Sequence, residues 1–313
     1  MSYINININM NRKKLCKIVN FVLVIFGFLI SFISTTVFAL SFGKPISKNN
    51  PELLSTVMVA TEIAPPRGEL CTGVLISETT VVTASHCFVN YNNPASDPNK
   101  TSATVSLLNQ KGQILESIPS VGVIVYPHAN GEQLQLESKM QIATMAQNNA
   151  ATYSDFQKIS LVGFELGLHD VAIVRLAHSF KVPHQAVKIY DGPLKVGDTL
   201  HFAGYGELIY NEAPKKDTPA QIADFRILRI AKNGLVLKAR GKTKPMPGDS
   251  GGPMYIYKNN QPMVAAINVD AKLILSKVQW QNLYSLDSNL LDGYSISMLL
   301  GKFASFLQPF TRN

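Results

Sequence analysis

Gly248-Asp249-Ser250-Gly251-Gly252-Pro253, near the end of this 313-residue chain, places a serine on a glycine-rich turn. Backbone amides of such a turn can converge on the group that the serine attacks, so the run predicts the nucleophile and oxyanion hole of an acyl-transfer enzyme. The spacing of Gly248, Ser250 and Gly252 also fits the nucleophile elbow of α/β-hydrolases, in which the catalytic histidine follows the serine. All six histidines of this chain precede Ser250, which excludes that class.

A histidine and an aspartate upstream complete a candidate catalytic set. From Leu70 to Cys87, two runs rich in β-branched residues flank a polar break, which predicts strand, turn and strand with His86 near the end. Asp170 heads a later apolar strand. His169 competes as the base, but neighbours on a strand point to opposite faces, so it cannot easily share that carboxylate. The remaining histidines are expected to be solvated or structural, without zinc spacing: His128, His178, His184 and His201.

These three segments, in this order, resemble the signature blocks of the chymotrypsin/trypsin-like serine protease family. The likeness spans roughly residues 55–310 and includes Gly197 to Gly206, which is similar to a second-barrel strand ending in a glycine-aromatic-glycine turn. It implies an all-β fold of two antiparallel Greek-key β-barrels with the active site in the cleft between them, plus a C-terminal α-helix. Apolar residues at helical intervals from 298 to 310 mark this helix. The resemblance packs the helix on the second barrel, while a helix on a membrane surface is the rival interpretation.

The chemistry of such a site assigns a role to each residue. Ser250 would be the nucleophile, His86 the general base and then acid, and Asp170 the carboxylate that orients the imidazole. The backbone amides of Gly248 and Ser250 would bind the oxyanion. Ser85 departs from the family, where alanine usually precedes this histidine.

The resemblance also indicates which residues form the substrate pocket. By the resemblance, Lys244 lies at its base, and the strand containing Asn268, Val269 and Asp270 supplies the edge that pairs with substrate. An inward Lys244 would favour an acidic substrate side chain. Asp270, which stands where glycine is common, could instead neutralise Lys244 or narrow the pocket, and the long segment 276–293 resembles an enlarged pocket-rim loop.

Asp249 raises a question about activation. In the resembling zymogens this aspartate binds a newly cut N-terminus, but no matching start sequence exists here. In the segment 40–54, the only basic residues at which a protease could cut are Lys44 and Lys48. Because a buried carboxylate without a cation is costly, we expect a processed terminus or another cation to meet Asp249.

The N-terminus predicts export. A basic stretch from Arg12 to Lys17 precedes an apolar segment, and Val37-Phe38-Ala39 fits a signal-peptidase site, so cleavage is expected after Ala39. An uncleaved anchor is the alternative, because residues 18–43 carry no charge. The formal charge of +8 falls to +4 without the four basic residues of this leader, and no basic run remains to attract a nucleic acid.

Two cysteines of the mature chain, Cys71 and Cys87, lie at the two ends of the histidine block. In an exported protein they are expected to pair, with unpaired buried thiols or metal ligation as the alternatives. The resemblance implies the same disulfide.

The predicted organisation follows from these observations. A signal peptide (1–39) and an N-terminal segment open to processing (40–54) precede the first barrel (55–180), with a surface insertion at about 129–154. The second barrel and C-terminal helix take up 181–313. We expect a secreted or periplasmic serine endopeptidase that is a monomer and acts on polypeptides, needs no cofactor or metal, and binds neither nucleic acid nor, in its mature form, a membrane. A catalytically silent binding or signalling protein with the same fold is the alternative.

Overall fold

The computed structural model describes residues 43–48, 50–64, 67–88, 100–126, 169–206, 219–241, 243–273 and 293–311. All of them belong to one unit, Phe38–Asn313. The expected signal peptide, the insertion at 129–154 and residues 276–292 of the pocket-rim segment lie outside the described residues. Within the described ranges, no helix is long and apolar enough to span a bilayer.

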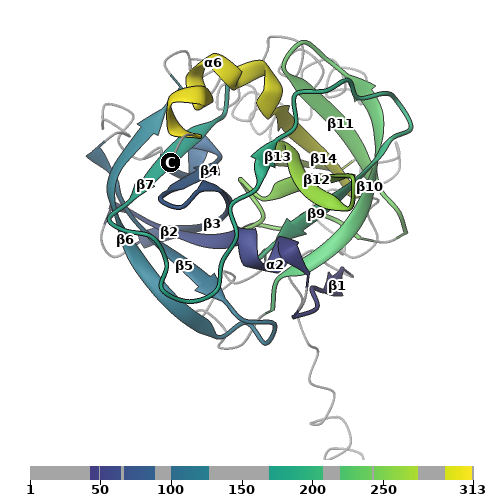
Figure 1. The fold of residues 1–313 in the computed structure, drawn as a ribbon. Helices are drawn as coiled ribbons and strands as arrows, with labels where there is room; N and C mark the ends of the chain where they lie inside the picture. The colour runs from purple at the N-terminus through teal and green to yellow at the C-terminus, as the bar shows by residue number, and fades with distance from the viewer. Residues whose placement is uncertain are drawn as a thin grey trace, which may run out of the picture. The chain divides into compact units, whose positions relative to one another are not determined.

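Six antiparallel strands close into the first barrel, on the left of Figure 1. Residues that alternate along a strand point to the same face. Val57 and Val59 on one strand, with Val74 on the next, are completely buried in this barrel. The strands are β2 (Thr56–Ala64), β3 (Arg67–Ser77), β4 (Thr80–Thr83), β5 (Ser102–Leu108), β6 (Ile114–Val125) and β7 (Ala172–Leu176).

Six further strands form the second barrel, on the right of Figure 1. Phe202 and Phe225 meet edge to face in its core, with ring centroids 5.4 Å apart. The strands are β9 (Thr199–Gly204), β10 (Gln221–Ile230), β11 (Gly234–Ala239), β12 (Pro253–Lys258), β13 (Gln261–Leu273) and β14 (Gly293–Leu299). A two-residue strand, β8 (Lys188–Ile189), pairs with β13 in parallel.

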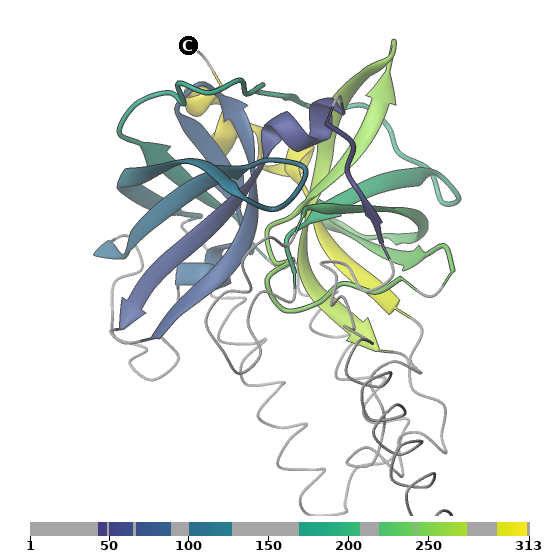
Figure 2. The same ribbon diagram turned by 90° about the horizontal axis from the view of Figure 1, so that it is seen from below.

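The two barrels have the same strand order. The sequence of neighbours is β2-β3-β4-β7-β6-β5 in the first and β9-β10-β11-β14-β13-β12 in the second, where pairing between β9 and β10 helps to close the ring. In each barrel the third strand therefore lies beside the sixth. Figures 1 and 2 show the barrels side by side. The predicted all-β fold of two antiparallel barrels is confirmed.

The segment that precedes the first barrel in sequence pairs with a strand of the second barrel. β1 (Lys44–Pro45) pairs with the start of β10, and the next residue, Ile46, is buried and donates its amide to the Ala220 carbonyl at 3.0 Å. A short helix, α2 (Pro51–Ser55), follows and leads into β2. The expected cut sites around Lys44 thus lie next to residues that are hydrogen-bonded to the second barrel.

The C-terminal helix is present but starts later than predicted. It begins at Leu300, because Met298 and Leu299 are still paired within β14, and it combines η5 (Leu300–Phe303), α6 (Ala304–Leu307) and η6 (Gln308–Phe310). It contacts both barrels, because η5 packs against β13 of the second barrel while its aromatic side chains also reach the first barrel. Phe303 and Phe306 both meet Tyr126, at the end of β6, edge to face with centroids 5.1 Å apart.

Candidate active site

His86 and Asp170 form a direct, largely buried pair. His86 lies on a short 3₁₀ helix, η1 (Ser85–Phe88), after β4, and Asp170 lies just before β7, the strand beside β4. The imidazole Nδ1 is 2.7 Å from Oδ2 of Asp170, and the His86 backbone amide donates to Oδ1 at 2.9 Å. Because Nδ1 faces a carboxylate, it carries the proton, and Nε2 is the unprotonated nitrogen that can act as a base.

The residue that departs from the family contributes to this pair. The Ser85 hydroxyl donates to Oδ1 of Asp170 at 2.8 Å. Burial raises the pKa of Asp170, but the charge of His86 and the hydrogen bonds from His86 and Ser85 outweigh it and hold this pKa below its ordinary value. Asp170 therefore stays ionised, as an orienting carboxylate must.

The loop that carries Ser250 lies against the strand that leads to His86. A side chain at Gly251 would overlap the Thr83 hydroxyl and the Thr72 carbonyl, and Gly251 also has a positive φ of 79°. Only glycine meets both demands. This close approach places the Ser250 loop against residue 83, three positions before His86.

Two backbone amides of this loop are available for an oxyanion. Those of Asp249, Gly251 and Gly252 donate to the carbonyls of Met246, Asn268 and Asp249, respectively. Those of Gly248 and Ser250 have no hydrogen-bond acceptor in the described part of the chain. Gly248 has a φ of 95°, a conformation that glycine adopts without strain.

Thr72, on β3 of the first barrel, connects the Ser250 loop to both barrels. Its amide donates to the Ser250 carbonyl at 2.8 Å, and its hydroxyl donates to the Gly248 carbonyl at 2.8 Å. The same hydroxyl accepts a hydrogen bond from the Tyr205 amide at 3.1 Å. No motif drew attention to Thr72, although it directly follows Cys71.

Asp249 is fully buried, and backbone amides meet both of its oxygens. Gly206 donates to Oδ1 at 2.7 Å and Met246 to Oδ2 at 2.9 Å. A Cβ at Gly204 or Gly206 would overlap the carboxylate, which explains the glycine-aromatic-glycine turn seen in the sequence. The sequence had led us to expect a cation beside Asp249, whereas these two donors are backbone amides.

Of the residues expected to form the substrate pocket, Asn268 contacts this loop directly. Lys244 is buried, with 3% of its surface exposed. Asn268 and Val269 are buried on β13, where Asn268 exchanges backbone hydrogen bonds with Gly251 and Gly252 at 2.6 and 2.8 Å. The side chain of Asp270 lies outside the described atoms, while its backbone pairs with Ile296 of β14.

The predicted disulfide is present between Cys71 and Cys87. Cys71, Cys87 and His86 bring potential metal ligands within 4.8 Å of one another, but both sulfurs are used in the disulfide and offer no thiolate to a metal. The bond joins β3 to the helix that carries His86. It therefore restrains the histidine directly.

Other histidines serve different contacts. His169 stacks on Tyr126, with ring centroids 5.2 Å apart, instead of approaching Asp170. His184 bonds Glu78, and His201 bonds Asp224. His128 lies outside the described residues.

Comparisons with known proteins agree with this geometry. Residues 47–272 match the family model described as Trypsin. No curated protein has a matching sequence. Among solved structures, one titled as GrC is similar with a TM-score of 0.53 and 15% identity, covering 87% of this chain and 99% of that one. A scabies mite inactivated protease paralogue, S-I1, is similar with a TM-score of 0.52 and 16% identity, covering 86% and 97%. The chain belongs to the chymotrypsin/trypsin-like serine protease family.

Proposed function

We propose that this chain is an exported serine endopeptidase that hydrolyses peptide bonds through an acyl-enzyme on Ser250. One observation carries the proposal: the buried Asp170 carboxylate holds the His86 ring by Nδ1 at 2.7 Å, beside a serine loop seated on the same strand end. This arrangement leaves Nε2 as the nitrogen that can accept a proton. A histidine–carboxylate pair with only a structural role would not require a glycine-rich serine loop beside it.

Each residue has a defined part in the reaction. His86 Nε2 removes the hydroxyl proton of Ser250 as the oxygen attacks the scissile carbonyl, and it then gives this proton to the leaving amine. Asp170 stabilises the imidazolium that forms and remains ionised throughout. Water repeats the sequence on the ester and releases the acid.

The free amides of Gly248 and Ser250 supply the electrostatic part of catalysis. They would donate to the oxyanion of the tetrahedral intermediate, where each donor is worth about 3 to 4 kcal/mol in a comparable enzyme. Thr72 supports this hole because its hydroxyl fixes the Gly248 carbonyl. This hydrogen bond holds the peptide that follows the Gly248 amide in one orientation before substrate arrives.

Export is the second part of the proposal. Disulfides form and persist mainly in oxidising compartments, and Cys71–Cys87 belongs to the histidine region itself. The basic and apolar leader before Ala39 supplies the signal. N-terminal sequencing of the protein recovered from the medium or periplasm tests this, and a start near residue 40 is expected.

A fluorophosphonate probe tests the catalytic proposal directly. Labelling on Ser250 is expected in the unmodified chain and is expected to vanish in Ser250→Ala and in His86→Ala. Cleavage of a denatured protein substrate should be lost in the same variants. A folded chain that neither labels nor cleaves would instead be a catalytically silent protein, as the name of the scabies mite paralogue describes that protein.

A further inference from the structure

The two oxygens of the Asp170 carboxylate have different hydrogen-bond partners. Oδ1 accepts from the Ser85 hydroxyl at 2.8 Å and from the His86 backbone amide at 2.9 Å. Oδ2 lies 2.7 Å from His86 Nδ1 and has no other hydrogen-bond partner among the residues that the structure describes. One oxygen is therefore held by two donors of η1, while the other faces the imidazole.

The Ser85 hydroxyl changes the charge of this carboxylate more than its position. The His86 amide already holds Oδ1, so the carboxylate would keep its place without the hydroxyl. Because Ser85 is fully buried, no solvent competes for its hydrogen bond. A donor on Oδ1 stabilises negative charge on that oxygen and draws it away from Oδ2. The carboxylate consequently attracts a protonated imidazole less strongly.

The charged side chains of the elements packed against this pair face elsewhere. β4 carries none, and Arg175 of β7 lies over an aromatic ring of the C-terminal helix. The ring of His169 stacks on an aromatic ring just after β6. Both oxygens of Asp249, in the serine loop, accept backbone amides. Burial raises the pKa of Asp170, and of the described side chains only His86 and Ser85 lower it.

We propose that Ser85 is a positioning residue that acts through Asp170: its hydroxyl draws charge from the carboxylate, so His86 becomes a neutral base at lower pH than it would with alanine at position 85. This inference rests on the proposed function, because it concerns the pH range of the same reaction. The serine that departs from the family thus extends activity toward acid pH.

Titration of the histidine signals by NMR tests this inference without any need for hydrolysis. The exported chain, labelled with ¹⁵N and carrying Ser250→Ala to prevent self-digestion, is compared with the same chain carrying Ser85→Ala as well. A spectrum of His86→Gln identifies the His86 signals. In Ser85→Ala the midpoint of the His86 titration is expected to rise by about half a pH unit, because the carboxylate has lost a hydrogen bond.

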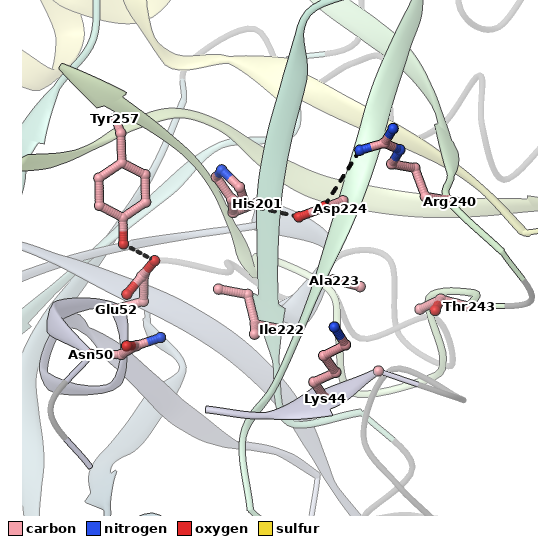
Figure 3. Close-up of a pocket in the computed structure, with 11 residues that line it drawn as sticks. Lys44, Asn50, Glu52, His201, Ile222, Ala223, Asp224, Arg240, Thr243 and Tyr257 are labelled. Carbon is pink, nitrogen blue, oxygen red and sulfur yellow. Dashed lines mark hydrogen bonds and ion pairs between the residues drawn. The ribbon is translucent and has the colours of Figure 1, made fainter. Parts of the chain in front are cut away.

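A second histidine–carboxylate pair provides an internal reference in the same spectra. His201 Nδ1 lies 2.9 Å from Asp224 Oδ1, and the other oxygen of Asp224 lies 3.9 Å from an Arg240 nitrogen. These three residues line a pocket on the second barrel, whereas Ser85 belongs to the first (Figure 3). The His201 signals should therefore follow pH identically in both proteins.

Kinetics provide the second measurement, in chains that retain Ser250. The acid side of the kcat/KM profile reports protonation of the free base. In Ser85→Ala, kcat/KM should fall about threefold on this side, as a shift of half a unit requires, and should be unchanged at alkaline pH. Ser106→Ala is the matched control, because it removes another buried hydroxyl of the first barrel, which lies 2.8 Å from the Ser117 hydroxyl. It should change neither the profile nor the His86 titration.

Thermal unfolding checks that each variant is folded. The inference is overturned if the His86 midpoint stays in place or falls in folded Ser85→Ala, if it moves equally in Ser106→Ala, or if kcat/KM falls equally at all pH values. An unmodified chain that neither hydrolyses peptides nor reacts with a fluorophosphonate would overturn the proposed function instead. The titration would then still decide whether Ser85 acts on His86.

Discussion

Two histidine–carboxylate pairs in this molecule have the same length but different chemistry. His86 Nδ1 lies 2.7 Å from Asp170, and His184 Nε2 lies 2.7 Å from Glu78. The Nδ1 of His184 lies 2.9 Å from the Val182 carbonyl, so both of its nitrogens are engaged. In His86 the carboxylate faces Nδ1, so Nε2 is the nitrogen that would act as the base in the proposed reaction. The two pairs therefore differ in which ring nitrogen faces the carboxylate and not in the distance.

Burial separates the two pairs as well. Asp170 is 2% exposed, while the Glu78 side chain is 50% exposed. A serine hydroxyl donates to the carboxylate in both, from Ser85 to Asp170 at 2.8 Å and from Ser179 to Glu78 at 2.7 Å. A nearby serine hydroxyl therefore does not identify a nucleophile.

The largest expected effect comes from removing each histidine in turn. His86→Ala should lower kcat by about 10⁶-fold, because the base that activates Ser250 is lost. His184→Ala should leave kcat within about twofold, since surface substitutions away from a site have small effects. Peptide hydrolysis by the purified variants measures both. Comparable losses in folded His86→Ala and His184→Ala would contradict the distinction.

The carboxylates of the two pairs, Asp170 and Glu78, should also differ in their effect on kcat. Asp170→Asn should reduce kcat by about 10⁴-fold, because the amide favours the wrong imidazole tautomer while it preserves the shape of the site. Glu78→Gln serves as the matched control and should leave kcat unchanged. If Asp170→Asn raised KM and left kcat unchanged, an orienting role for Asp170 would be contradicted.

The Cys71–Cys87 disulfide is expected to affect the His86–Asp170 pair but not the His184–Glu78 pair. Replacing Cys71 and Cys87 by serine should destabilise the fold by roughly 3 kcal/mol, as expected for a loop of this length. It should also lower activity, because Cys87 directly follows His86. Denaturant unfolding and hydrolysis measure the two effects. Full activity in the double serine variant would show that the disulfide does not position His86.

The smallest effect is a pH dependence of the surface pair. Burial lowers the pKa of His184, but its hydrogen bonds to Val182 and Glu78 outweigh this and raise it above 6.5. Hydrogen bonds from Ser179 and His184 lower the pKa of Glu78 below 4.5. The stabilisation by His184 is therefore complete below 6.5 and disappears as pH rises through its raised pKa. The stabilisation by Glu78 is complete above 4.5 and disappears as pH falls through its lowered pKa.

The free energy of unfolding should accordingly differ most between the unmodified chain and Glu78→Gln from about pH 4.5 to 6.5. The difference should stay below about 1 kcal/mol, because solvent screens the exposed Glu78. Denaturant unfolding of both proteins across pH 4 to 9 measures it. A difference that grows above pH 8 would contradict this account.

The sequence was sufficient to predict the two-barrel fold and the pairing of Cys71 with Cys87. The two-barrel fold follows from the resemblance to the family, which is carried by local runs, such as the β-branched stretches around the histidine and the glycines around the serine, and by the order in which these runs occur. The sequence also shows serine at position 85, where the family usually has alanine. In the structure, the Ser85 hydroxyl donates to Asp170.

Contacts between distant segments could not be predicted in the same way. The apolar pattern of the C-terminal helix shows which face is buried, but it does not show that Tyr126 is what Phe303 meets. Two donors to Asp249 are the backbone amides of Gly206 and Met246, which no pattern of side-chain charges could reveal.

The position of Thr72 has a consequence for how the molecule unfolds. Its fully buried hydroxyl belongs to one half of the protein, whereas both of its hydrogen-bond partners belong to the other. If either half opened alone, these groups would lose their partners, so intermediates with a single folded half should be poorly populated. Heat should melt the two halves together in a single cooperative transition.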